Sequence, residues 1–130
     1  MRLLVDTHVW LWFFLDSKRL GKEVEDALTS AESTVFFSSV SAVEIAIKWS
    51  LGKLPLPEPP PSFVQRRVAL AAHTPLPFTQ EHALSLATLE WHHKDPFDRM
   101  LVAQASCEGL TLVTADAAMR PYGVPLMWIG

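Results

Sequence analysis

Short apolar runs along the chain alternate with segments whose apolar residues recur every three or four positions. The short runs are Arg2–Val5 (RLLV), Thr34–Phe37 (TVFF) and Leu110–Val113 (LTLV). Runs of this kind predict strands that are buried on both faces of a sheet. The closing segment PLMWI predicts a late edge strand.

Four longer segments have the spacing of amphipathic helices. The first holds Leu20, Val24, Ala27, Leu28 and Ala31, the second Val40, Val43, Ala46, Ile47 and Leu51, the third Leu84, Ala87 and Leu89 after Thr79, and the fourth Met100, Leu101 and Ala105. Strands that alternate with helices predict an α/β fold, in which a doubly wound parallel sheet carries helices on both faces.

Prolines are concentrated in the segment Leu54–Pro61, LPLPEPPP. Proline removes a backbone donor and fixes φ, so we expect neither helix nor central strand there. The stretch before it is too short to complete a doubly wound sheet. The segment therefore predicts a stiff connector inside one domain that spans residues 1–130.

Composition excludes several classes of protein. Forty-nine per cent of the 130 residues are apolar and 19% are charged, which is too hydrophobic for a disordered chain. The longest apolar run, Val9–Leu15, is far short of the roughly 20 residues that span a membrane. Asp6 and His8 interrupt the start before a signal peptide could form, so we expect a cytoplasmic protein without a membrane partner. The single Cys107 excludes an internal disulfide and a multi-cysteine zinc site.

Four carboxylates fall near the same predicted edge of the sheet. Asp6 directly follows the first strand, and Asp116 closely follows the strand LTLV. Glu44 lies in the helix after TVFF, and Asp98 opens the helix in DPFDRMLVAQA. Ligands of open parallel sheets bind beyond the carboxyl ends of the strands. We therefore expect the four acids to converge there.

Each acid taken alone also has a purely structural interpretation. Asp95, Pro96 and Asp98 together are typical of a helix start, with Asp95 as the cap. Asp116 fits a cap and Asp6 a turn residue. Glu44 is different, because its helix is otherwise apolar around it and a buried charge needs a partner.

Convergence of the four acids favours a metal site. Two carboxylates about 4 Å apart repel each other by roughly 4 kcal/mol, and a divalent cation with oxygen ligands removes this repulsion. Carboxylate and water ligands suit Mg²⁺ or Mn²⁺ better than zinc. The net charge of −3 argues against a simple nucleic-acid coat, but setting these four acids aside leaves 11 basic against 14 − 4 = 10 acidic residues. Such a site can activate water for phosphodiester cleavage.

Several neighbours of the acids are candidates for supporting roles. The hydroxyls of Thr7, Ser39 and Thr114 can orient water or carboxylates, or act only as caps. His8 can touch substrate, and Asp95 and Arg99 flank Asp98. The other histidines are interpreted as surface residues: His73, His82, His92 and His93.

Four motifs together resemble the PIN-domain ribonucleases, in particular the VapC-type toxins of bacterial toxin–antitoxin pairs. They are LLVDTHVWLW, SSVSAVEIAIKWSLGKL, HHKDPFDRMLVAQA and LVTAD, in that order along nearly the whole chain. The resemblance implies a PIN-like α/β/α sandwich, Mg²⁺- or Mn²⁺-dependent endoribonuclease activity on RNA, and a homodimer. It also implies a cognate antitoxin that blocks the site. The family's acidic positions correspond to Asp6, Glu44, Asp98 and Asp116, with Asp6 and Asp98 its most regular metal ligands.

The apolar segment VWLWFFL suggests a protein partner independently of the resemblance. As a helix it is apolar on all sides, so one face covers the sheet and the other exposes aromatic rings. We therefore expect Trp10 and Trp12 to form part of an antitoxin or dimer surface. The alternative is a helix buried on both sides within one domain.

Three other functions remain as alternatives of different weight. A phosphatase or receiver-type domain with Asp6 as phosphorylated nucleophile is disfavoured, because His8 stands where phosphatases need a second aspartate. A non-catalytic RNA- or protein-binding module is disfavoured by four intact acids. An RNA-processing nuclease without a toxin role stays open.

Overall fold

A five-stranded, fully parallel sheet forms the centre of the protein. The computed structural model describes residues 1–129, and its strands are adjacent in the order β3-β2-β1-β4-β5. Their bounds are β1 Arg2–Val5, β2 Thr34–Ser38, β3 Thr74–Leu76, β4 Thr111–Thr114 and β5 Leu126–Trp128. The predicted parallel sheet is confirmed, including the late edge strand.

Strand β3 is the one strand that the pattern of apolar residues did not predict. It is short, contains Pro75 and pairs with β2 at one edge of the sheet. Proline is tolerated there because an edge strand has one side without ladder hydrogen bonds. Its three residues therefore carry no alternating pattern that could identify them.

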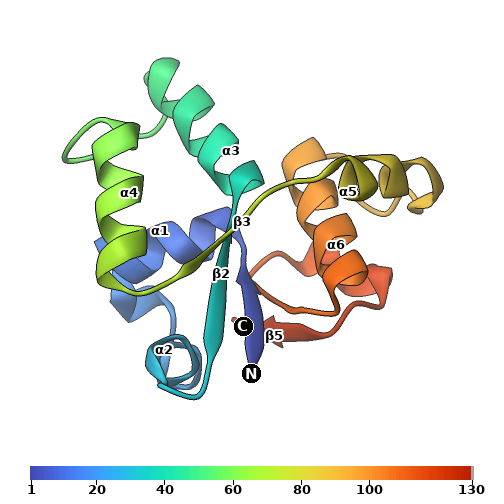
Figure 1. Cartoon of the computed structure of the whole chain (residues 1–130), viewed down its shortest axis with the longest axis horizontal. Helices are drawn as coiled ribbons and strands as arrows, with labels where there is room; N and C mark the ends of the chain where they lie inside the picture. The colour runs from blue at the N-terminus through green and yellow to red at the C-terminus, as the bar shows by residue number, and fades with distance from the viewer. Residues whose placement is uncertain (130) are drawn as a thin grey trace.

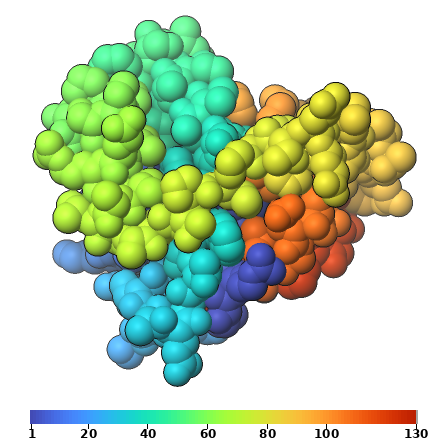
Figure 2. Space-filling view, viewed as in Figure 1, coloured from blue at the N-terminus to red at the C-terminus, as the bar shows by residue number. Residues whose placement is uncertain are grey.

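Helices cover both faces of the sheet (Figure 1). The α-helices are α1 Thr7–Leu15, α2 Lys22–Thr29, α3 Ser39–Ser50, α4 Pro60–Leu70, α5 Gln80–Ser85 and α6 Pro96–Glu108, and the 3₁₀ helices are η1 Ser17–Arg19, η2 Leu86–Thr88 and η3 Ala117–Tyr122. Helices α1, α2 and α4 lie on one side and α5 and α6 on the other, while α3 contacts both α4 and α6. This is the expected α/β/α sandwich. The segment that joins α4 to α5 crosses between the layers on the face seen in Figure 2.

Side chains of the central strands alternate between two apolar cores. Leu3 and Val5 of β1 pack with α1 and α2, and Leu4 between them packs with α6. The same strand therefore has no polar face, which explains its unbroken apolar sequence. Asp6 directly follows β1, at the end of the sheet where the carboxyl ends of the strands lie.

Two of the predicted helices differ in detail. In α3 the expected apolar face is partly exposed, with Val43 at 49% and Ile47 at 44%, because Val40, Ser41, Glu44 and Ile45 face inward. The third predicted helix is shorter than expected, because α5 ends at Ser85 and a 3₁₀ turn follows. Leu84, which was expected on its apolar face, is exposed.

The proline-rich connector is also shorter than expected. Helix α4 begins at Pro60, so the prediction that Leu54–Pro61 excludes helix is wrong for its last two residues. The N–H groups of a first helical turn have no partner within the helix, and proline loses nothing there.

The expectation of an exposed aromatic face on α1 is wrong for Trp10. This side chain is completely buried, with its ring centre 4.4 Å from that of Phe37 and its Nε1 donating to His73 Nδ1 at 3.1 Å. Trp12, Phe13 and Phe14 are only partly buried. Within residues 1–129, every helix is too short or too polar to cross a membrane.

Candidate metal centre

Four acidic residues, Asp6, Asp95, Asp98 and Asp116, line one pocket of about 370 Å³ above the carboxyl ends of β1 and β4. Asp6 follows β1, Asp116 follows β4, and Asp98 lies in the first turn of α6. Because β1 and β4 are neighbours and the chain leaves β1 toward β2, this is the switch point of the doubly wound sheet. The local fold therefore brings together acids that lie far apart in sequence.

Asp6 joins the first strand to α1. Its Oδ1 accepts from the His8 N–H at 2.9 Å as the cap of α1, and its Oδ2 accepts from the Thr114 hydroxyl at 2.8 Å. Burial raises the pKa of Asp6, although these hydrogen bonds act in the opposite direction. Asp6 therefore acts as a structural cap of α1 and also lines the pocket of acids.

Asp98 is held at the start of α6 by the predicted cap. Asp95 Oδ1 accepts from the N–H groups of Phe97 at 2.8 Å and Asp98 at 3.2 Å, and Pro96 occupies the first turn. Burial, together with the charges of Asp6 and Asp95, raises the pKa of Asp98 to about 7. Like charges are therefore crowded around this carboxyl group.

His93 is the main residue of the pocket that sequence reasoning missed. It was interpreted as a surface residue without ligand spacing, but its Nε2 lies 2.8 Å from Asp98 Oδ2 and 2.9 Å from Asp116 Oδ2. Partial burial opposes its protonation, but the hydrogen bonds to Asp116 and Asp98 raise the pKa of His93. The available signal was its position five residues before Asp98, in a loop whose path the sequence does not reveal.

The loop that carries His93 is fixed by side chains from α6 and η3. Tyr122 Oη accepts from the N–H groups of His92 at 3.1 Å and His93 at 2.9 Å. The guanidinium of Arg99 donates to Glu90 O at 2.7 Å and to Tyr122 Oη at 3.1 Å. Arg99 therefore holds the loop that carries His93, and it contacts this loop and not the carboxylates themselves.

Asp116 completes the close group. Its Oδ1 accepts from Ala118 N at 3.0 Å, and its own N–H donates to Thr114 Oγ1 at 3.0 Å. Partial burial acts the other way, but the hydrogen bonds from Ala118 and His93 lower the pKa of Asp116. Asp116 is thus ionised where Asp98 is readily protonated.

Glu44 is buried and is not among the residues that line the pocket, although its charge contributes to the raised pKa of Asp6, and Lys48 is its counter-ion. Its Oε2 accepts from Lys48 Nζ one helical turn later, whereas Oε1 is buried without a hydrogen-bond partner in the described part of the chain. Partial burial acts to lower the pKa of Lys48, but the nearby carboxylates of Glu44, Asp95 and Asp98 outweigh this effect and raise it. The sequence predicted that a buried Glu44 needs a partner, but it did not identify Lys48 as that partner.

The supporting residues are placed unevenly. Thr114 contacts Asp6 and Asp116, and Thr7 donates to Ser41 Oγ at 2.8 Å. His8 lines the pocket with a side chain that is 59% exposed. Ser39 is exposed, and the buried Ser38 caps α3 in its place.

The donor set fits a hard divalent cation. One ligand atom from each of His93, Asp98 and Asp116 lies within 4.8 Å of the others, and Asp6 lines the same pocket. The unpartnered Glu44 Oε1 is a further oxygen that a bound water or ion can satisfy. Carboxylate oxygens in this number suit Mg²⁺ or Mn²⁺.

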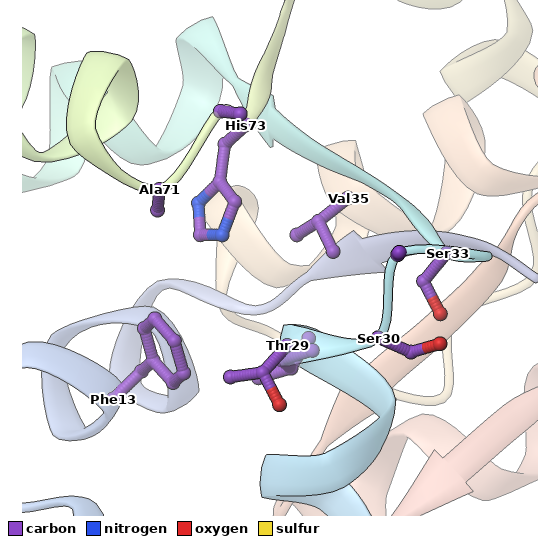
Figure 3. Close-up of a pocket in the computed structure, with 10 residues that line it drawn as sticks. Phe13, Thr29, Ser30, Ser33, Val35, Ala71 and His73 are labelled. Atoms are coloured by element: carbon purple, nitrogen blue, oxygen red, sulfur yellow. The ribbon is translucent and has the colours of Figure 1, made fainter.

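A second pocket, of about 390 Å³, lies where β2 and β3 begin (Figure 3). Figure 3 shows the ring of His73 pointing into the space between Phe13, Thr29 and Val35. His73 is buried, and its Nε2 has no hydrogen-bond partner in residues 1–129. Burial lowers the pKa of His73.

The surface interpretation is therefore wrong for His73, and it is wrong for His82 as well. His82 is buried as part of a capping box with Thr79, and its Nε2 lies 3.1 Å from Glu108 Oε2. Of the four histidines interpreted as surface residues, His92 is exposed. Sequence position alone did not separate these cases, because each ring is buried by residues from distant elements.

Comparison with known proteins agrees with the fold and the motifs. Residues 3–124 match the PIN domain family. The chain therefore belongs to the PIN domain family. It is 37% identical over 60 residues to Ribonuclease VapC16 of Mycobacterium tuberculosis, a stretch covering 46% of this chain and 43% of that relative. The match thus spans less than half of the curated relative.

Solved structures are similar over the whole chain. A chain of VapBC2 from Rickettsia felis, bound to a DNA fragment from its promoter, has a TM-score of 0.74 and 14% identity, with 100% of both chains covered. DNA-bound VapBC from Salmonella typhimurium gives 0.72 and 15%, covering 100% of this chain and 99% of that one. FitAcB from Neisseria gonorrhoeae gives 0.67 and 19%, covering 96% of each. At these identities the similarity establishes the shared fold.

Proposed function

We propose that this protein is a Mg²⁺- or Mn²⁺-dependent endoribonuclease that acts as the toxin of a toxin–antitoxin pair. The observation that carries the proposal is the convergence of Asp6, Asp98 and Asp116 on one pocket at the switch point of a PIN-domain sheet. The match to a relative named Ribonuclease VapC16 supports RNA as the substrate.

Asp6, Asp98 and Asp116 would hold the cation, and Glu44 would add negative charge close to Asp6. A bound divalent cation supplies positive charge to the phosphate and lowers the pKa of water. Asp98 must give up its proton to serve as a ligand, because its pKa is about 7. His93 keeps the oxygens of Asp98 and Asp116 together, and Thr114 fixes the orientation of Asp6. Lys48 compensates the charge of Glu44.

The first test is cleavage of a panel of cellular RNAs with Mg²⁺, with Mn²⁺ and with a chelator. We expect Asp98→Asn and Asp6→Asn to lower the rate by a factor on the order of 1000, since a lost metal ligand removes several kcal/mol of transition-state stabilisation. Asp26→Asn, on an exposed face of α2, is the matched control. Equal cleavage by all variants, or cleavage in chelator, would overturn the proposal.

The toxin role rests on the resemblance and on the neighbours, which are chains of toxin–antitoxin complexes. Expression of the unmodified chain should arrest growth, and co-expression of an adjacent small gene should restore it by blocking the pocket. Growth unaffected by the active chain, together with intact RNA cleavage, would favour the processing nuclease. A chain that binds RNA without cutting it would be the non-catalytic module.

A homodimer is part of the same proposal. Exposed apolar residues on α3, namely Val43, Ile47, Trp49 and Leu51, form a surface that supports a protein contact. Light scattering of the purified chain tests this, with Ile47→Lys as the variant expected to give monomers. A monomeric unmodified chain at micromolar concentration would remove the dimer.

A further inference from the structure

The pocket that contains the acids has a second end made of planar groups. Trp12 and His8 of α1 line it together with the acids. The guanidinium carbon of Arg19, from η1, lies 4.0 Å from the centre of the Trp12 ring, and the His8 ring centre lies 6.4 Å from it. The pocket that holds the acids is therefore also lined by the Trp12 ring, and the Arg19 guanidinium lies against that ring; Trp12 and Arg19 are called the wall below.

We infer that Trp12 and Arg19 form the subsite for an unpaired base of the RNA substrate, beside the phosphate that is held at the acids. This inference rests on the proposed nuclease function. Unstacked RNA bases bind to aromatic rings and to guanidinium planes. The pocket volume of about 370 Å³ is within the range of small-molecule sites, so it has room for a single base.

The placement of the two tryptophans of α1 supports this role for Trp12. Residues two positions apart on a helix face different ways, and Trp10 is completely buried against Phe37 while Trp12 is partly exposed in the pocket. Trp10 therefore belongs to the buried core, whereas Trp12 lines the pocket. An indole left partly in water beside a phosphate-binding site is suited to a stacking partner.

Arg19 contributes a free positive charge at the same place. Its side chain is exposed, and no carboxylate lies within ion-pair distance of it in residues 1–129. Its charge is therefore available to a phosphate next to the stacked base. A cation beside an acidic pocket favours the approach of a polyanionic substrate.

This arrangement specifies the class of substrate. A base inside a duplex can enter the subsite only at the free-energy cost of breaking its base pair, so the subsite selects single-stranded RNA or loops. Every base has an aromatic face, so stacking on Trp12 discriminates weakly among the four bases. The wall therefore selects unpaired nucleotides more than a particular sequence.

The test is binding of a short single-stranded RNA that contains 2-aminopurine, whose fluorescence falls when it stacks. The protein carries Asp98→Asn to prevent cleavage, and Mg²⁺ is present. We expect Trp12→Ala to weaken binding about 5- to 150-fold and to abolish the fluorescence change. Trp12→Phe should retain most of both, and Arg19→Ala should weaken binding about 5-fold. Lys18→Ala, at an exposed lysine next to Arg19, is the matched control for the charge and should bind as the parent does.

The outcomes separate this inference from the proposed function. Unchanged RNA binding by Trp12→Ala would overturn the subsite, while the metal-dependent cleavage assay still stands for the function. Equal binding of single- and double-stranded RNA would overturn it as well. If Trp12→Ala loses the antitoxin and keeps RNA, the wall belongs to the protein partner and the inference is wrong. Circular dichroism of each variant confirms that the fold is kept.

Discussion

The two pockets of this protein each contain a histidine, and their surroundings have opposite effects on it. His93 at the carboxyl ends of the strands contacts two carboxylates, which raise its pKa. His73 at the other end contacts aromatic rings and the Trp10 indole, and burial lowers its pKa. One ring is therefore favoured as a cation and the other as a neutral group.

The difference shows which pocket is built for chemistry. In the His73 pocket, Trp10 Nε1 donates to His73 Nδ1, which leaves the imidazole proton on Nε2. In the acid pocket, burial together with the charges of Asp6 and Asp95 raises the pKa of Asp98 to about 7. Unrelieved charge is costly to fold, and it persists where a ligand relieves it.

The largest effect is expected in the pocket of the neutral histidine. Trp10→Ala removes a completely buried ring and the donor to His73, and should lower the free energy of unfolding by about 3–5 kcal/mol. Trp10→Phe keeps an aromatic ring and should cost less. Urea unfolding measures both. A loss below about 1 kcal/mol for the alanine variant would mean that this pocket does not hold the core together.

A smaller effect is expected from removing the charged histidine. His93→Ala should weaken Mn²⁺ binding by about 10- to 100-fold, because groups that orient metal ligands contribute this much. Tyr122→Phe, which removes the acceptor for the N–H groups of His92 and His93 and for the Arg99 guanidinium, should have a milder effect in the same direction. Calorimetric titration with Mn²⁺ gives the affinities. His73→Ala is the control and should bind Mn²⁺ as the parent does.

The pH dependence of metal binding should follow Asp98. Below its pKa of about 7 the carboxyl group is protonated, so a cation must displace a proton. The affinity for Mn²⁺ should therefore fall about tenfold for each unit of pH below 7 and level off above it. Titrations between pH 5.5 and 8 measure this. A flat profile would mean that Asp98 is not a ligand.

The smallest effect concerns His73 and the stability of the protein. The folded pKa lies below the unfolded value of 6.5, so the unfolded chain binds more protons in acid. Stability from the neutral ring is complete above pH 6.5 and is lost as pH falls through the folded pKa. His73→Leu should show a shallower loss of stability between pH 7 and 5. Identical slopes for variant and parent would contradict the assignment.

Much of the fold was predictable because periodicity reports burial directly. Strands β1, β2 and β4 are buried on both faces, so their sequences are continuous apolar runs. Strand β3 escaped because three residues at an edge, with Pro75 among them, need no such pattern. On α3 the apolar residues outnumber the inward positions, so periodicity could not show that Glu44 faces inward and Val43 outward.

The candidate site was predictable where it depends on the ends of strands and not where it depends on loops. Asp6, Asp98 and Asp116 follow from strand ends and a helix cap, and the structure brings these three together in one pocket. His93 and Lys48 were missed because their partners are set by a loop path and by a helix rotation. The exposure of Trp10 was predicted wrongly because the sequence does not say which side of α1 meets the sheet.

The hydrogen bond from Thr114 to Asp6 spans 108 positions of the chain, and it has a consequence for synthesis. The first strand leaves the ribosome early, but its neighbour β4 and the residues that hold His93 emerge only near the end. Domains fold as units once their distant pairings are possible. The acid pocket is therefore among the last features to form, and under the proposed function an unfinished chain would be unable to cut the RNA around the ribosome that is making it.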